Sequence, residues 1–398
     1  MVGPRDALTM SMGQATDGGK RPMHVLPLAK RAEVVEHLME GNGIRPTSRL
    51  CGVDKNTVLS LLLSIARGAE ALHNRLVRDL DVVHIEADEL HSFVKKRVKN
   101  ITPADPPEIG EQWVWVAFAR STKLIVSWRV GKRDEENAVL FMRDMRARLS
   151  TVPILSTDGL QAYLTAVGEA FFSPEQPPGA VHFGQVVKSF TNNRRDYDKV
   201  APAHGPPRTT KRVICGTPEI GEISTSITER EMLALRTNLR RLVRRGSGHS
   251  KSLEHHTAAV AAFATWANFC RPSSALKGKT PAMVSGLADH RWATTEYVEA
   301  CLLAEPCEPP APGPLAHRAA PEAPARVTST GRVIQLVRPA GKSAPAAPPA
   351  SPEKRPAVPP AGKQLDLFAQ SAARPPTPPK PLPPKGTQLS LFGDPDPS

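Results

Sequence analysis

The chain has 398 residues, a formal net charge of +13 and 41 prolines, and 40% of its residues are hydrophobic. That length suffices for two or more domains. The five cysteines form no C-x-x-C pair, which argues against a zinc knuckle or a disulfide framework. No run of 18 apolar residues is present, and the first residues lack the layout of a secretory signal, so we expect a soluble, intracellular protein without membrane contacts. The positive charge favours a polyanionic partner, and nucleic acid is the commonest one.

Residues 30–75, which follow a flexible N-terminal stretch of residues 1–29, show the hydrophobic period of helices. Val34, Val35 and Leu38 share one stripe, and Asp54 is placed as the N-cap of a last helix. This pattern predicts a helix-turn-helix, with a small helical bundle that binds no nucleic acid as the alternative. The residues expected at DNA are Lys55, Asn56 and Thr57 near base edges and Arg45 and Arg49 near phosphates.

From residue 81 the period changes to two, which indicates strands. Three strands at 81–94, 112–120 and 123–131 form an expected antiparallel meander. A helix, a short buried strand and a second helix follow over residues 134–171. The strand pattern alone supports a mixed α/β domain, and the order of its elements is that of the ribonuclease H-like fold. We assign this catalytic domain to residues 80–300, with an insertion at about 172–222.

Acidic residues stand where such a fold needs them. Asp88 lies in the middle of the first strand and Asp158 at the end of the fourth, so adjacent strands would bring the two carboxylates together. Two Mg²⁺ or Mn²⁺ ions would relieve their repulsion. Glu229 begins a later helix, and Arg236 follows two turns on, on the same side. A metal ligand followed by a cation suits a site that holds a phosphodiester.

Here the chain resembles the IS1 family of bacterial insertion-element transposases, over about residues 31–300. The resemblance rests on "GIRPTSRLCGVDKNTV", "EADELHSFV", "STDGLQAY", "ITEREMLALR", "GHSKSLEHH" and "NFCRPSSALKGKTPAM". It implies that Asp88, Asp158 and Glu229 are a DDE triad, that Arg236 is the basic residue that follows it, and that the protein cuts and joins double-stranded DNA at element ends. It also implies an oligomer on DNA and a place at the bacterial nucleoid in the cytoplasm.

The chain departs from that family at a few positions. Met232 stands where an Asn is usual, Ser273 or Ser274 replaces a His, and Gly248 opens an altered basic motif. A catalytically decayed, non-enzymatic DNA-binding regulator is therefore the alternative, with a nuclease that does not join DNA as a further one. Glu86 shares a face with Asp88 and is interpreted as an acid that supports a metal ligand or is solvated, with direct help in metal binding as the alternative. The histidines 249, 255 and 256 are interpreted as a solvated helix face.

Residues 304–398 are rich in proline and poor in aromatic side chains, which predicts a disordered tail. Two copies of Gln-Leu-x-Leu-Phe interrupt it and resemble the pentapeptide by which bacterial proteins bind the β sliding clamp. That resemblance implies a docking role in which two tethered motifs raise avidity. The residues concerned are Gln364, Leu365, Leu367, Phe368, Gln388, Leu389, Leu391 and Phe392.

Overall fold

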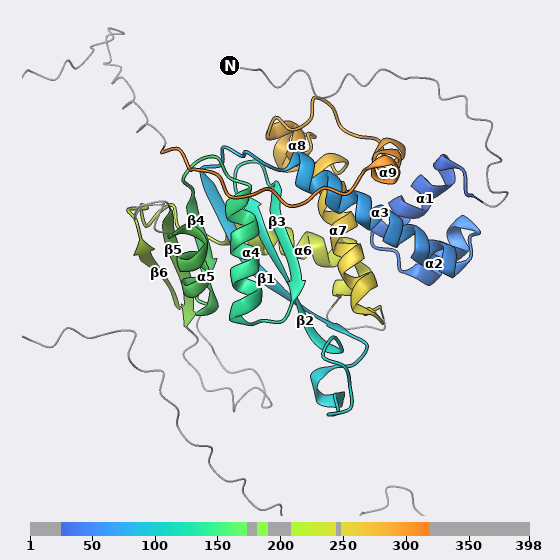
Figure 1. The fold of residues 1–398 in the computed structure, drawn as a ribbon, viewed down its shortest axis with the longest axis horizontal. Coiled ribbons are helices and arrows are strands. Elements are labelled where there is room, and N and C mark those ends of the chain that lie inside the picture. The colour runs from blue at the N-terminus through green and yellow to red at the C-terminus, as the bar shows by residue number, and fades with distance from the viewer. Residues whose placement is uncertain (1–24, 173–180, 190–207, 244–247, 318–398) are drawn as a thin grey trace, which may run out of the picture. The chain divides into compact units, whose positions relative to one another are not determined.

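A six-stranded sheet in the order β3-β2-β1-β4-β5-β6 organises the computed structural model (Figure 1). The structure describes residues 25–172, 181–189, 208–243 and 248–317, and both Gln-Leu-x-Leu-Phe motifs lie outside these ranges. The described residues belong to one compact unit, Met1–Pro321. The strands are β1 (His84–Val94), β2 (Gly110–Ala119), β3 (Ile125–Gly131), β4 (Ile154–Asp158), β5 (His182–Ser189) and β6 (Arg208–Cys215).

The sheet is mixed, as the sequence predicts. β1, β2 and β3 pair antiparallel, whereas β4 runs parallel to β1 and β5 parallel to β4. This order with helices on both faces is the ribonuclease H-like arrangement, so the predicted fold class is confirmed. The segment interpreted as an insertion, 172–222, contributes β5 and β6 to the sheet. The apolar residues Val181, Phe183 and Val186 of this segment are buried because they belong to the core of the fold.

Helices cover both faces of the sheet (Figure 1). Tyr163 of α5 contacts Glu89 on one face, while Thr228 of α6 contacts Glu86 on the other, because neighbouring pleats of β1 alternate in direction. The helices that follow β3 are α4 (Glu135–Ala147), α5 (Ala162–Phe171), α6 (Ser226–Asn238), α7 (Leu253–Phe269), α8 (Pro281–Val284) and α9 (Thr294–Leu303). No helix in the described ranges is long and apolar enough to cross a membrane.

The N-terminal region forms α1 (Leu28–Met39), α2 (Ile44–Cys51) and α3 (Lys55–Leu76), and its predicted apolar stripe is buried. α3 packs along α7 and α9, and α1 packs on α9. Gly68 lies inside α3, where an added Cβ would stand 1.8 Å from the backbone oxygen of Cys301. Glycine therefore permits a helix contact too close for any side chain.

The start of the predicted tail, residues 304–317, lies along the folded unit as an extended strap (Figure 1). Asn74 Nδ2 donates to the backbone oxygen of Cys307 at 2.8 Å, and the backbone N–H of Ala316 donates to Ser150 O at 2.9 Å. The strap contributes backbone groups to both bonds, so its side-chain composition gave no sign of them. The remainder of the predicted tail, 318–398, lies outside the described residues.

Candidate active site

Three carboxylates converge where β1 and β4 run side by side. Asp88 lies within β1, and Asp158 is the last residue of β4. The register pairs Ala87 with Thr157, so the next residue of each parallel strand sets Asp88 beside Asp158. Oxygens of Asp88, Asp158 and Glu89 lie within 4.8 Å of one another. The structure thus brings together two of the sequence-predicted catalytic residues and adds Glu89 to them.

Glu89 is buried and held from two sides. Arg133, in the loop between β3 and α4, donates to Glu89 Oε1 through Nε at 2.7 Å and also through Nη2. The Tyr163 hydroxyl donates to Glu89 Oε2 at 2.9 Å. Burial, followed by repulsion from Asp158 and Asp88, raises the pKa of Glu89 to about 7 against the attraction of Arg133. Burial is thus the main cause of the raised pKa, and the neighbouring carboxylates add to it.

The donor set suits a divalent cation. Arg133 Nη2 lies 3.9 Å from Asp158 Oδ2, while its guanidinium carbon stands 4.8 Å from the centre of the Trp113 ring. A cation with oxygen ligands at this point would reduce the repulsion of Glu89 by Asp158 and Asp88. Carboxylate oxygens are the ligands that Mg²⁺ and Mn²⁺ prefer. The residues present fit the metal-binding role predicted from the sequence.

Glu86 fixes the start of α6 to β1. It is fully buried, and its Oε2 accepts from the backbone N–H groups of Ile227 and Thr228 at 2.8 and 3.0 Å. Arg120 Nε donates to its Oε1 at 2.7 Å. A buried carboxylate at a helix N-terminus satisfies N–H groups that have no partner within the helix. Glu86 is therefore not a solvated acid, and its role is to position α6.

Glu229 follows Thr228 in the first turn of α6, where its side chain is exposed. It is carried by a helix start that is bonded to β1 two residues before Asp88. Its carboxylate is not among the three that lie within 4.8 Å of one another. Arg236, two turns further on, donates from Nη1 to the backbone oxygen of Leu242 at 3.1 Å. A catalytic role for Glu229 or Arg236 stays a prediction.

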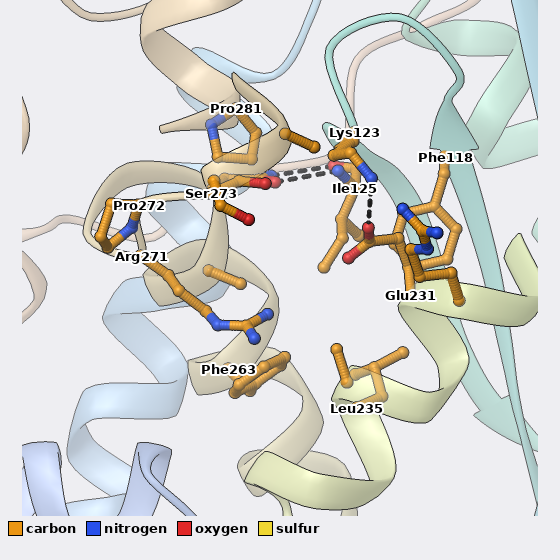
Figure 2. Close-up of a pocket in the computed structure, with 16 residues that line it drawn as sticks. Phe118, Lys123, Ile125, Glu231, Leu235, Phe263, Arg271, Pro272, Ser273 and Pro281 are labelled. Carbon is orange, nitrogen blue, oxygen red and sulfur yellow. Dashed lines mark hydrogen bonds and ion pairs between the residues drawn. The ribbon is translucent and has the colours of Figure 1, made fainter. Parts of the chain in front are cut away.

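Two contacts seat α6 and α7 on the β2–β3 hairpin, beside a cavity of about 260 Å³ (Figure 2). Lys123 Nζ forms an ion pair with Glu231 Oε1 of α6 at 2.7 Å. Asn268 of α7 both donates to and accepts from the backbone of Ile125, each bond 2.9 Å long. The amide of Asn268 thereby bonds the backbone of an edge strand as a neighbouring strand would. Both helices are tied to the sheet that carries the acids.

The positions at which the chain departs from the IS1 pattern lie outside the acidic cluster. Met232 is buried in the core, and Ser273 lines the cavity of Figure 2. An added Cβ at Gly248 would meet Arg240 Cγ at 2.9 Å. None of these substitutions removes a carboxylate from the β1–β4 junction.

The side chains predicted to contact DNA are exposed on α2 and at the start of α3. Asp54 caps α3 as expected, its carboxylate accepting from the backbone N–H of Asn56 at 2.8 Å. Gly52 adopts φ 63° at the end of α2, which turns the chain into α3. The exposed residues are Arg45, Arg49, Lys55, Asn56 and Thr57. Their contact with DNA stays a prediction.

Sequence reasoning missed the partners of the acids. Alternation along β1 places Glu89 on the opposite side of the strand from Asp88, yet its oxygens lie within 4.8 Å of those of Asp88 and Asp158. Arg133 and Tyr163 come from other elements, and no local pattern links them to β1. The interpretation of the three histidines as a solvated face is wrong for His256, which is fully buried and bonds Ser92 Oγ at 2.9 Å.

No protein-family model matches the chain, and a search of curated proteins found no match. Among solved structures, the chain is similar to "Crystal structure of the Mos1 Strand Transfer Complex", with 13% identity, 37% of this chain and 55% of that chain covered, and a TM-score of 0.15. It is also similar to "Crystal structure of a pre-cleavage Mos1 transpososome", with 12% identity, 36% and 56% covered, and a TM-score of 0.13. The chain spans little more than half of either protein.

Proposed function

We propose that the protein is a DDE-type DNA transposase, similar to those of the IS1 family, that cuts and joins DNA with Mg²⁺ or Mn²⁺. The observation that carries the proposal is the meeting of Asp88, Glu89 and Asp158 at the β1–β4 junction of a ribonuclease H-like sheet. A phosphodiester is an anion that gains charge during its displacement, so a site of oxygen ligands for divalent cations suits that reaction.

In this proposal Asp88 and Asp158 bind the ions, and Glu229 completes the ligand set from α6. Ions bound there would polarise the scissile phosphodiester. The protein's own contribution is orientation, because Arg133 and Tyr163 hold Glu89 in one position before any substrate arrives. Water would cut a phosphodiester at the element end, and the freed 3′ hydroxyl would then attack target DNA in a transesterification.

Recognition of the ends falls to the N-terminal helices in this proposal. The exposed Lys55, Asn56 and Thr57 at the start of α3 reach base edges, while Arg45 and Arg49 contact phosphates. The N-cap at Asp54 and the turn at Gly52 fix the start of α3, whose first residues are exposed and would enter the major groove.

The test uses labelled duplexes that cover the DNA flanking the coding sequence, incubated with plasmid and Mg²⁺. We expect cutting and strand transfer by the parent protein, and loss of both by orders of magnitude in Asp88→Asn, Asp158→Asn and Glu229→Gln with duplex binding retained. Glu169→Gln is the control, because Glu169 is an exposed glutamate that pairs with Arg143 away from the cluster.

Three outcomes separate the alternatives. Binding without cutting by the parent protein would identify a DNA-binding regulator. Cutting without joining would identify a nuclease. Full activity in any one of the three amide variants would remove that residue from the catalytic set.

A further inference from the structure

A groove of about 890 Å³ lies between the N-terminal helices and the segment that joins α6 to α7. Its N-terminal wall includes the start of α3, and its opposite wall comes from residues 239–241 and 248–255. The described lining residues include no carboxylate. They include five cations, namely Arg45, Lys55, Arg240, Arg241 and Lys251. We call this feature the basic groove.

Arg241 is the most constrained cation of the basic groove. Its Nη1 donates to Ser250 Oγ at 3.1 Å, whereas its buried Nη2 has no hydrogen-bond partner among the described residues. Burial lowers the pKa of Arg241 to about 10, with no carboxylate among the described residues to offset it. A buried guanidinium without a counter-ion is costly, and an anion in the groove would reduce that cost.

His249, on the same wall as Arg241, also has a buried nitrogen without a hydrogen-bond partner among the described residues. This nitrogen is Nδ1, and the ring stacks on Phe93, with ring centres 4.6 Å apart. Lys251 Nζ lies at 2.5 Å from His249 Nε2, so the cation is held at the groove although it is exposed. Two buried polar groups without partners and a rim of cations together define an anion-binding surface.

We propose that the basic groove binds the phosphodiester backbone of the duplex that α3 reads. This inference rests on the proposed DNA-binding function and deepens it. Lys55 and Asn56 line the same groove, and in a helix-turn-helix complex the phosphates that flank the recognition helix lie beside its N-terminus. Arg240 and Lys251 on the opposite wall then contact phosphates that the N-terminal helices do not reach.

The proposal has a structural consequence for catalysis. The opposite wall continues from α6, which begins at Ser226, is bonded through Thr228 to Glu86 of β1 and carries Glu229. A duplex held across the basic groove would therefore touch both the recognition helices and the chain that leads to the acidic cluster. Specific binding and placement of the scissile strand would then depend on the same phosphates.

The test compares duplex binding by the parent protein and Arg240→Ala/Lys251→Ala across a series of salt concentrations, using fluorescence anisotropy. Both side chains are exposed, so the fold should be retained. We expect the variant to bind specific and random duplexes more weakly than the parent protein does. The slope of log association constant against log salt concentration should be shallower by about 1.8, because each of the two lost phosphate contacts contributes about 0.9. The control is Arg143→Ala/Lys279→Ala, which removes the same charge outside the groove.

Each outcome decides the inference. If the groove variant and the control variant bind equally, the groove does not hold phosphates, although DNA binding itself stands. If the groove variant loses affinity for single strands but not for duplexes, the occupant is not duplex DNA and the inference is wrong. A parent protein that binds no DNA would overturn the proposed function as well.

Discussion

Substitution of Gly68 by Ala tests whether helices α1–α3 are packed into the unit that carries the acidic cluster. The new Cβ would stand 1.8 Å from Cys301 O and 2.5 Å from Cys301 C, both backbone atoms of α9. Ordinary contact begins at 3.4 Å, so α3 and α9 would have to separate by about 1.6 Å. Overpacking of this kind costs about 3 kcal/mol, and the better helix propensity of Ala returns about 1 kcal/mol. We expect a net loss of about 2 kcal/mol in the free energy of unfolding.

Gly168→Ala is the matched control. Gly168 also lies inside a helix, α5, but an added Cβ there meets nothing within 4 Å. Only the propensity gain remains, so this variant should be more stable than the parent by about 0.5–1 kcal/mol. The two substitutions are chemically identical and are predicted to have opposite signs.

The assay is urea unfolding followed by tryptophan fluorescence, since the chain contains five tryptophans. The midpoint should fall for Gly68→Ala and rise for Gly168→Ala. If α1–α3 formed an independent module that did not pack on α9, Gly68 would behave as Gly168 does. A Gly68→Ala protein as stable as the parent would therefore refute the packing argument.

Three other predictions concern pH, DNA sequence and the tail. Burial, aided by the charge of Arg241, lowers the pKa of His256 to about 4 in the folded protein. As the pH falls below 6.5, His256 is therefore protonated in the unfolded protein before it is protonated in the folded protein, and the free energy of unfolding should fall by up to about 1.4 kcal/mol per pH unit down to about pH 4. Urea titrations at several pH values should show a weaker pH dependence for His256→Gln. Lys55→Ala with Asn56→Ala should reduce the preference for flanking duplexes over random DNA in competition binding, and equal losses on both would show contact with phosphates only. Phe368→Ala with Phe392→Ala should abolish retention of the full chain on immobilised β clamp, and unchanged retention would exclude the motifs as docking peptides.

The sequence predicted the fold class because its signals are local. The period-two alternation from residue 81 and the N-cap at Asp54 depend on near neighbours in the chain, and both are found where they were expected. The acids at 88 and 158 could be paired because parallel strands align their residues in a simple way. These features need no knowledge of tertiary contacts.

The features that were missed depend on contacts distant in sequence. Arg133 and Tyr163 reach Glu89 from separate elements, and the role of Gly68 depends on Cys301 more than 200 residues away. A glycine in a helix has the same local appearance whether it ends the helix or admits a neighbour. His256 also looked exposed, because its polar partners lie on β1 and before α7.

The packing of α1 and α3 on α9 sets an order for folding during synthesis. The helices from residue 28 onward gain part of their packing surface when α7 (Leu253–Phe269) has been made, and the rest only when residues 294–303 have been made. Contacts across such a separation form slowly, because the intervening chain must first be brought together. Until then the apolar side chains of α1 stay accessible to chaperones and proteases. A translation product that stops before α9 would present helices α1–α3 without that support, and we expect such fragments to be degraded.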